Sequence, residues 1–127
     1  MTKGLKHRIL VVEDEELINE MLEEYFALTA PELELVFAKD LGEAREKLKG
    51  GTFALCVVDC NLPDGTACDL FAEGIFHCPV IVTTGYVDEE KLSRVRSFTR
   101  TPVLILKKPY LPADLHRKIL ELLHQAP

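Results

Sequence analysis

Reactive side chains follow four short apolar runs of this sequence, at the points where the runs end. Glu13 and Asp14 follow the first of these runs, Asp59 and Thr84 each end another, and Lys108 follows the last. Carboxylates can hold a divalent cation or act as nucleophiles, and an ammonium group can bind an anionic group such as a phosphate. The elements around these five residues decide whether they can act together.

The stretch LCVVDCNLPDG, at positions 55–65, indicates how one of these residues is positioned. Four apolar residues followed by Asp59 and a Pro-Asp-Gly turn are typical of a buried strand that places a carboxylate at its C-terminal end. Similar apolar runs alternate with segments of helical periodicity, which predicts a parallel sheet with crossover helices. We expect strands at 8–12, 33–38, 54–59, 80–84 and 103–107.

The predicted helices lie between these strands. The clearest helix is capped by Asp40, has Glu43 three positions later and stops at the pair Gly50 and Gly51. The first helix is indicated by apolar residues at 18, 21, 22 and 25. Two further helices are expected at 66–73 and 88–97, and the last one begins at Pro112. The segment at 66–73 is short and poorly defined.

This alternation predicts an α/β fold, a flavodoxin-like doubly wound sandwich of five parallel strands and five helices with right-handed crossovers. We expect the strand order 2-1-3-4-5 by analogy with known folds, not from periodicity. The 127 residues suit one domain spanning 1–127, with an ordered core at about 7–125. The ends of the first, third, fourth and fifth strands would then meet at one edge of the sheet.

Composition excludes several classes of partner. The net charge of −6, from 21 acidic and 15 basic residues, argues against direct nucleic-acid binding, and the basic cluster at 3–8 is interpreted as a solvated tail. No apolar run is long enough for a membrane span. The four cysteines form no C-x-x-C pair and no signal peptide precedes them, so we expect reduced thiols in a cytoplasmic protein.

A metal ion would explain why three acids share one edge of a sheet. Glu13, Asp14 and Asp59 would repel one another, and Lys108 would leave two of their three negative charges unbalanced. Mg²⁺ accepts oxygen ligands in a partly hydrated site. Asp14 and Asp59 could bind it directly, the backbone carbonyl of Asn61 could add a third oxygen, and Glu13 could hold an ordered water. Calcium remains possible on ligand type alone.

Such a site suits phosphoryl transfer to a carboxylate. Asp59 would be the nucleophile, and Lys108 would help to neutralise the phosphoryl oxygens. Thr84 would donate a hydrogen bond to the attached phosphoryl group, with the amide of Gly85 close by.

The sequence resembles the receiver domains of two-component response regulators over nearly its whole length. The resemblance rests on the acidic pair at 13–14, the D-x-x-L-P motif at 59–63, Thr84 followed by a small residue, and the pair Lys108 and Pro109. It implies a signalling switch that accepts a phosphoryl group on Asp59 from a phosphohistidine of a sensor histidine kinase or phosphotransfer protein. It also implies dependence on Mg²⁺, slow self-catalysed dephosphorylation, no separate enzymatic substrate, and a downstream partner or output domain that the sequence does not identify.

The sequence departs from this family pattern at two positions. Ala67 stands where many receivers have glycine, so we expect a shortened third helix. Ile105 stands where many have an aromatic ring that reports phosphorylation. We therefore expect the signal to leave through Thr84 and its loop, toward the fourth helix and fifth strand. Asn61 and Tyr86 are expected to flank the path of water to the phosphoryl group, although Tyr86 could equally pack on its loop.

Three other functions are weighed against this one. A phosphatase similar to haloacid dehalogenases would need an acid two residues after its nucleophile, where this chain has Asn61. A flavin or nucleotide binder would need a loop rich in glycine after the first strand, where this chain has VEDEE. A docking module without phosphoryl chemistry would not need all five of the site residues.

Overall fold

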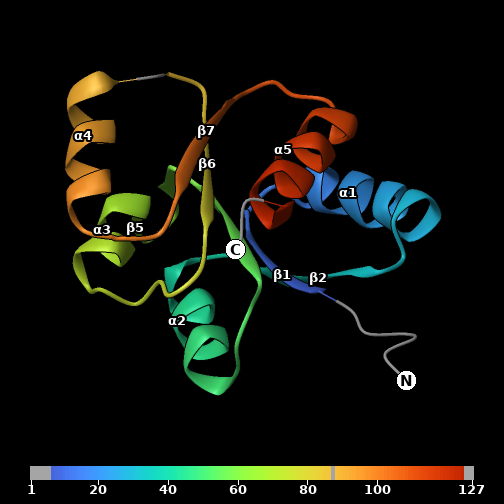
Figure 1. Ribbon diagram of the computed structural model, residues 1–127, viewed down its shortest axis with the longest axis horizontal. Helices are drawn as coiled ribbons and strands as arrows, with labels where there is room; N and C mark the ends of the chain where they lie inside the picture. Colours follow the sequence, from blue (N-terminus) through green and yellow to red (C-terminus); the bar gives the residue numbers. More distant parts are fainter. Residues whose placement is uncertain (1–6, 87, 125–127) are drawn as a thin grey trace.

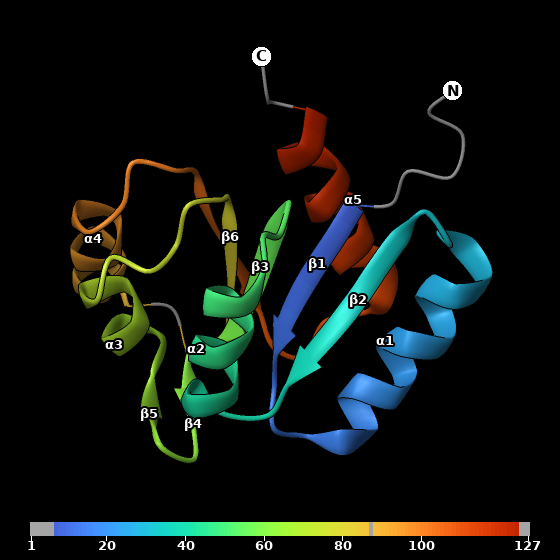
Figure 2. The same cartoon turned by 90° about the horizontal axis from the view of Figure 1, so that it is seen from below.

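A computed structural model of the chain describes residues 7–86 and 88–124. Its centre is a parallel sheet of five strands in the order β2-β1-β3-β6-β7 (Figure 2). These strands are β1 (His7–Val12), β2 (Leu33–Ala38), β3 (Leu55–Asp59), β6 (Val80–Thr84) and β7 (Val103–Lys107). The sheet confirms the predicted fold class and the predicted order, because β6 and β7 are the fourth and fifth strands of this sheet along the chain.

Five helices cover the two faces of the sheet. Helices α1 and α5 lie on one face, and α2, α3 and α4 lie on the other (Figure 1). Their bounds are α1 (Glu16–Thr29), α2 (Leu41–Gly50), α3 (Ala67–Ala72), α4 (Glu89–Ser97) and α5 (Pro112–His124). Among the residues that the structure describes, no helix has both the length and the apolar character needed to cross a membrane.

Alternating residues of the central strands fill two separate cores. Along β3, Leu55 and Val57 point toward α1 and α5, whereas Cys56 and Val58 point toward α2, α3 and α4. All four side chains are buried, so β3 is apolar on both faces, as expected for the middle strand of a covered parallel sheet. This burial fixes where β3 ends, and therefore where Asp59 lies.

A small hairpin follows β3 that the sequence did not predict. It pairs β4 (Asn61–Leu62) with β5 (Gly65–Thr66) around the turn that contains Asp64. Asp64 accepts hydrogen bonds from the backbone N–H groups of Leu41, at 2.9 Å, and Gly42, at 3.2 Å. Because these groups belong to the first turn of α2, the hairpin is tied to that helix.

The remaining differences from the predicted elements are small. The first strand begins at His7 and the third at Leu55, each one residue from its predicted start. The predicted cap of α2 is confirmed, because Asp40 accepts a hydrogen bond of 2.8 Å from the N–H of Glu43. Helix α3 is only six residues long, as the departure at position 67 suggested. Residues 1–6 and 125–127 of the predicted domain lie outside the described residues.

Candidate functional site

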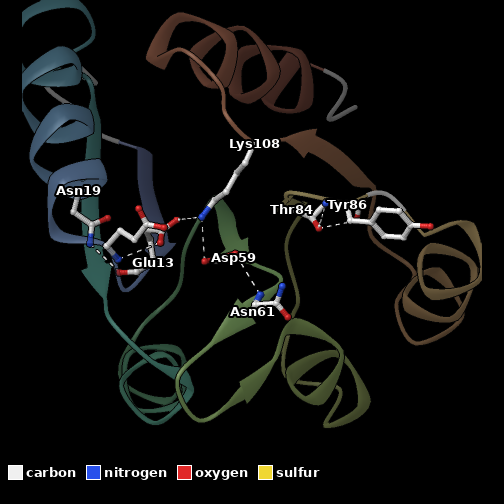
Figure 3. A network of polar contacts seen from close by, with 8 residues as sticks. Glu13, Asn19, Asp59, Asn61, Thr84, Tyr86 and Lys108 are labelled. Carbon is white, nitrogen blue, oxygen red and sulfur yellow. Dashed lines mark hydrogen bonds and ion pairs between the residues drawn. The ribbon is translucent and has the colours of Figure 1, made fainter.

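The predicted site residues lie at the C-terminal edge of the parallel sheet. Glu13 follows β1, Asp59 ends β3, Thr84 ends β6 and Lys108 follows β7. Because all of these strands run in the same direction, their C-terminal ends present the four residues along one edge (Figure 3).

Lys108 lies between two buried carboxylates. Its Nζ is 2.8 Å from Oε1 of Glu13 and 3.1 Å from Oδ2 of Asp59, and its own side chain is 19% exposed. The backbone N–H of Lys108 donates to the carbonyl of Thr84 at 2.7 Å, which fixes the lysine beside the end of β6. The peptide bond between Lys108 and Pro109 is cis. The lysine therefore links the ends of β1, β3 and β7.

Glu13 is held in place from several directions. Its side chain is almost completely buried, and its Oε2 accepts a hydrogen bond of 3.2 Å from the N–H of Glu15. The side-chain amide of Asn19, in the first turns of α1, donates to the backbone carbonyl of Glu13 at 2.8 Å. The carboxylate of Glu13 is therefore fixed by its own loop and by Lys108, and its backbone by α1.

Three carboxylates form a cluster beside Lys108. One oxygen each from Glu13, Asp14 and Asp59 lies within 4.8 Å of the other two. Glu13 and Asp59 are buried and Asp14 is exposed, so the cluster is open to solvent on one side. The three acids and one ammonium leave an excess of negative charge. An all-oxygen, partly exposed cluster of this kind fits a hard divalent cation such as Mg²⁺.

Asp59 also contacts the chain that follows it. The N–H of Asn61 lies 3.3 Å from Oδ1 of Asp59, so each carboxylate oxygen has one hydrogen-bond donor, from Asn61 or from Lys108. Asp59 is 6% exposed as a whole residue. Its carboxylate is thus oriented by the protein within the cluster.

The pKa values of the buried groups reflect this environment. Burial raises the pKa of Glu13, and the charge of Asp59 adds to that effect, although hydrogen bonds from Lys108 and Glu15 oppose it. Burial alone would lower the pKa of Lys108, but the hydrogen bond to Glu13 and the charges of both carboxylates outweigh it and raise the pKa. Burial, with the charge of Glu13, raises the pKa of Tyr110 to about 12. Lys108 is accordingly charged and Tyr110 neutral at physiological pH.

Thr84 lies at the same edge but its hydroxyl is engaged elsewhere. It donates to the carbonyl oxygen of Tyr86 at 2.8 Å and lies 3.2 Å from the N–H of the same residue. The ring of Tyr86 points away from Asp59 and is 78% exposed (Figure 3). The structure therefore places neither the Thr84 hydroxyl nor the Tyr86 ring against the carboxylate cluster.

The two positions that depart from the family pattern meet in one small cavity. Ala67 and Ile105 both line an apolar cavity of about 30 Å³ beside Thr84 and Tyr86. Because α4 supplies further lining residues, including Val95, this cavity separates the edge of the sheet from α4. The loop of Thr84 thus lines the same cavity as α4.

Sequence reasoning missed two contributors to the site. Asn19 has no role predicted from the sequence, and the available signal is a polar residue at the start of the helix that follows β1. Tyr110 also has no predicted role, because its half-buried position near Glu13 and Lys108 depends on the turn that begins α5.

Comparisons with known proteins agree with this geometry. The family model of the response regulator receiver domain matches residues 9–120. A 65-residue segment, 51% of this chain, is 40% identical to the response regulator protein PilR of Pseudomonas aeruginosa, and it spans only 14% of that protein.

Solved structures show the same fold. A CheY-like receiver domain protein from Methanospirillum hungatei JF-1 is similar over 94% of this chain and 95% of its own, with 26% identity and a TM-score of 0.79. A two-component response regulator from Clostridium difficile is similar over 94% of this chain and 97% of its own, with 17% identity and a TM-score of 0.81.

Proposed function

The chain belongs to the family of response regulator receiver domains, and from that premise we propose that it is a phosphoacceptor switch in which Asp59 receives the phosphoryl group. The family membership sets aside the phosphatase and nucleotide-binder alternatives. The observation that carries the choice of residue is the position of Asp59, which is buried at the end of β3 and within 3.1 Å of Lys108.

The proposed donor is a phosphohistidine of a sensor histidine kinase or a phosphotransfer protein. An oxygen of the Asp59 carboxylate attacks the phosphorus atom, the bond between phosphorus and the imidazole nitrogen breaks, and that nitrogen keeps the electron pair. The product on this chain is an acyl phosphate. Later attack by water on the phosphorus restores the carboxylate and releases inorganic phosphate.

Lys108 and Thr84 have different proposed roles in this reaction. Lys108 already lies beside Asp59 and would form a charge-assisted contact with the phosphoryl oxygens. Thr84 would donate a hydrogen bond to the phosphoryl group only after its hydroxyl leaves the backbone of Tyr86. Lys108 would therefore support the transfer, and Thr84 would report that it has occurred.

We propose that Mg²⁺ is the cation of the acidic cluster. Glu13, Asp14 and Asp59 would hold it, with the backbone carbonyl of Asn61 as a further ligand. When bound, the ion would supply positive charge that lowers the repulsion between these acids and an incoming phosphoryl group.

The proposed response to phosphorylation is a change at α4 and β7. A phosphoryl group can shift the protein between two states only through contacts that differ between them. The Thr84 loop would be such a contact, and its place in the lining of the small cavity beside α4 supports this. A downstream protein partner or an output domain would read this surface.

The test is phosphorylation by acetyl phosphate with and without Mg²⁺. The parent should gain one phosphoryl group by intact mass, the adduct should be removed by hydroxylamine as expected for an acyl phosphate, and EDTA should prevent it. Asp59→Asn should not be labelled. Asp64→Asn, a matched change at the next aspartate along the chain, should be labelled like the parent. Undiminished labelling of Asp59→Asn would refute the proposal.

A further inference from the structure

Two buried cysteines lie close together at the opposite end of the central strands. Cys56 is the second residue of β3, and Cys78 lies just before β6. Their Sγ atoms are 3.4 Å apart. Cys56 is completely buried and Cys78 is 9% exposed.

The backbone of the sheet holds this pair in position. The N–H of Cys56 donates to the carbonyl of Pro79 at 3.0 Å, and Cys56 is in register with Val80. Since a disulfide has a sulfur–sulfur distance of about 2.05 Å, the two atoms at 3.4 Å need to approach by only about 1.4 Å. A side-chain adjustment of this size does not require β3 and β6 to separate.

The two thiols differ in their access to a cavity at this end of the sheet. Cys78 lines a cavity of about 180 Å³ together with Thr52, Phe53, Ile75 and the exposed residue His77. A cavity needs about 10–15 Å³ to hold one water molecule, so a small polar molecule has ample room. Cys56 is absent from the lining. A reagent in this cavity would therefore meet Cys78 first.

The contact between the two sulfurs also favours reaction at Cys78. The hydrogen bond that the two sulfurs share lowers the pKa of Cys78, although burial opposes this effect. The same hydrogen bond and burial raise the pKa of Cys56. Since the thiolate is the nucleophilic form of cysteine, the cavity beside Cys78 and the direction of its pKa shift both favour attack by Cys78.

We propose that Cys56 and Cys78 are an oxidisable pair, in which Cys78 reacts with a small hydroperoxide such as hydrogen peroxide and Cys56 resolves the product as a disulfide. In the first step the Cys78 thiolate attacks one peroxide oxygen, the O–O bond breaks, and hydroxide leaves. Cys78 is then a sulfenic acid. In the second step the Cys56 sulfur attacks the Cys78 sulfur, and the sulfenic oxygen leaves as water with the thiol proton. In sum, two thiols lose two hydrogens and one peroxide becomes two waters.

The disulfide would close a loop of chain that contains the phosphoacceptor region. Asp59, the β4–β5 hairpin and α3 all lie between positions 56 and 78. A cross-link lowers the conformational entropy of the unfolded chain, so oxidation should raise the melting temperature. This inference does not depend on phosphorylation of Asp59, because neither thiol takes part in that chemistry.

The other two cysteines provide a matched control within the same loop. Cys60 and Cys68 are partly exposed and line a different cavity, the apolar one beside Thr84 and Ile105. If the contact between the Cys56 and Cys78 sulfurs decides which disulfide forms, neither Cys60 nor Cys68 is needed for it. The double variant Cys60→Ser with Cys68→Ser should keep the reaction of the other pair.

The experiment is oxidation of the folded chain with hydrogen peroxide, followed by peptide mapping without reduction. The parent and the Cys60/Cys68 double variant should each yield one cross-link between the peptides of Cys56 and Cys78, with loss of two hydrogens that dithiothreitol restores. The variant Cys56→Ala should lack the cross-link and should instead form a dimedone adduct at Cys78, the mark of a sulfenic acid. Circular dichroism checks that this variant is folded.

Several results would overturn the proposal. They are an absence of cross-link in the folded parent, a cross-link that appears only in urea, or a cross-link between Cys60 and Cys68 instead. A dimedone adduct spread over all four cysteines would also overturn it, because it would show that the cavity confers no selectivity. If Cys56→Ala does not fold, the presence or absence of the cross-link in the folded parent decides the proposal.

Discussion

Lys108 Nζ lies closer to Glu13, at 2.8 Å, than to Asp59, at 3.1 Å, so the lysine is shared between two buried carboxylates from different strands. Neither carboxylate is exposed enough to be solvated by water alone. The ammonium therefore partly compensates both, and Asp14 adds a third negative charge within reach. The stability of the protein should therefore depend on the Lys108 ammonium and on any divalent cation in the cluster.

Removing the lysine charge should destabilise the metal-free protein. In Lys108→Met the length of the aliphatic side chain is nearly kept, but two buried carboxylates lose their cation. The free energy of unfolding should fall by about 3 kcal/mol, the typical cost of breaking a buried ion pair from one side. Urea denaturation in EDTA measures this change. Lys107→Met, at the exposed neighbouring position, is the control and should be close to the parent.

The same variant should respond more strongly to a divalent cation. Because Lys108→Met leaves more negative charge in the cluster, Mg²⁺ should restore more stability to it than it adds to the parent. Equal stability of Lys108→Met and Lys107→Met in EDTA would mean that the lysine does not compensate these acids.

Neutralising the exposed acid of the cluster should have two opposite effects. Asp14→Asn removes one ligand, so Mg²⁺ affinity measured by calorimetry should fall. It also removes repulsion, so the metal-free protein should gain up to about 1 kcal/mol, the energy of two unit charges 4 Å apart in water. Glu15→Gln is the control, since its carboxylate lies outside the cluster. A metal-free Asp14→Asn protein less stable than the parent would contradict the repulsion argument.

The capping contact of Asp64 should make stability depend on pH. Hydrogen bonds from the N–H groups of Leu41 and Gly42 lower the pKa of Asp64, and the charge of Arg45 contributes. A carboxylate whose pKa is lower in the folded state stabilises the protein above its unfolded pKa of about 3.9. That contribution is lost as the pH falls through the folded value.

Unfolding of the parent and of Asp64→Asn should therefore be compared between pH 7 and pH 2.5. The parent should be the more stable protein near neutral pH, and the difference should shrink below about pH 4. Glu24→Gln, a change at an exposed carboxylate of α1, is the control, and its stability difference from the parent should not shrink in this way. A difference that stays constant over the whole range would show that the contact does not depend on ionisation.

A side chain at position 65 should destabilise the protein. The φ of Gly65, +151°, is unfavourable for other residues, and a Cβ atom there would lie 2.6 Å from Oδ2 of Asp69 and 2.7 Å from Cδ1 of Leu41. Gly65→Ala should therefore cost about 1–3 kcal/mol of stability. Gly50→Ala is the matched control, because a Cβ there meets nothing within 4 Å and alanine favours a helix. Thermal unfolding of the two variants should shift in opposite directions.

The fold was predictable because its central strands are apolar on both faces. The short apolar run at 55–58 with a turn after it favoured a buried strand, which places the acid that ends it at the edge of the sheet. The β4–β5 hairpin was not predictable in the same way. Its strands are two residues long, and the contact that stabilises it joins Asp64 to Leu41, which is 23 positions away.

The candidate site was predictable in position but not in detail. The ends of the strands placed the acids and Lys108 correctly beside one another. The orientation of Thr84 could not be deduced, because its hydroxyl can bond either to its own loop or across the edge of the sheet. The structure has the first arrangement, with the backbone of Tyr86.

That orientation leads to a prediction about how the signal leaves the site. The Thr84 hydroxyl must release the backbone of Tyr86 before it can reach a phosphoryl group, and that release frees the loop that precedes α4. Beryllofluoride with Mg²⁺, as a mimic of the phosphoryl group, should therefore shift the amide resonances of α4 in the parent. Thr84→Ala should still bind the mimic at Asp59 but should lose most of the α4 shifts. Thr84→Ser keeps the hydroxyl and should retain them.

Ile105→Ala separates this route from one that runs through β7. Ile105 lines the cavity between Thr84 and α4, but it has no polar atom that could bind a phosphoryl group. If Thr84 carries the change, Ile105→Ala should keep the α4 shifts on addition of beryllofluoride, because the hydroxyl and its loop are intact. If Thr84→Ala responds like the parent, or if Ile105→Ala abolishes a response that Thr84→Ala keeps, the signal does not leave through Thr84.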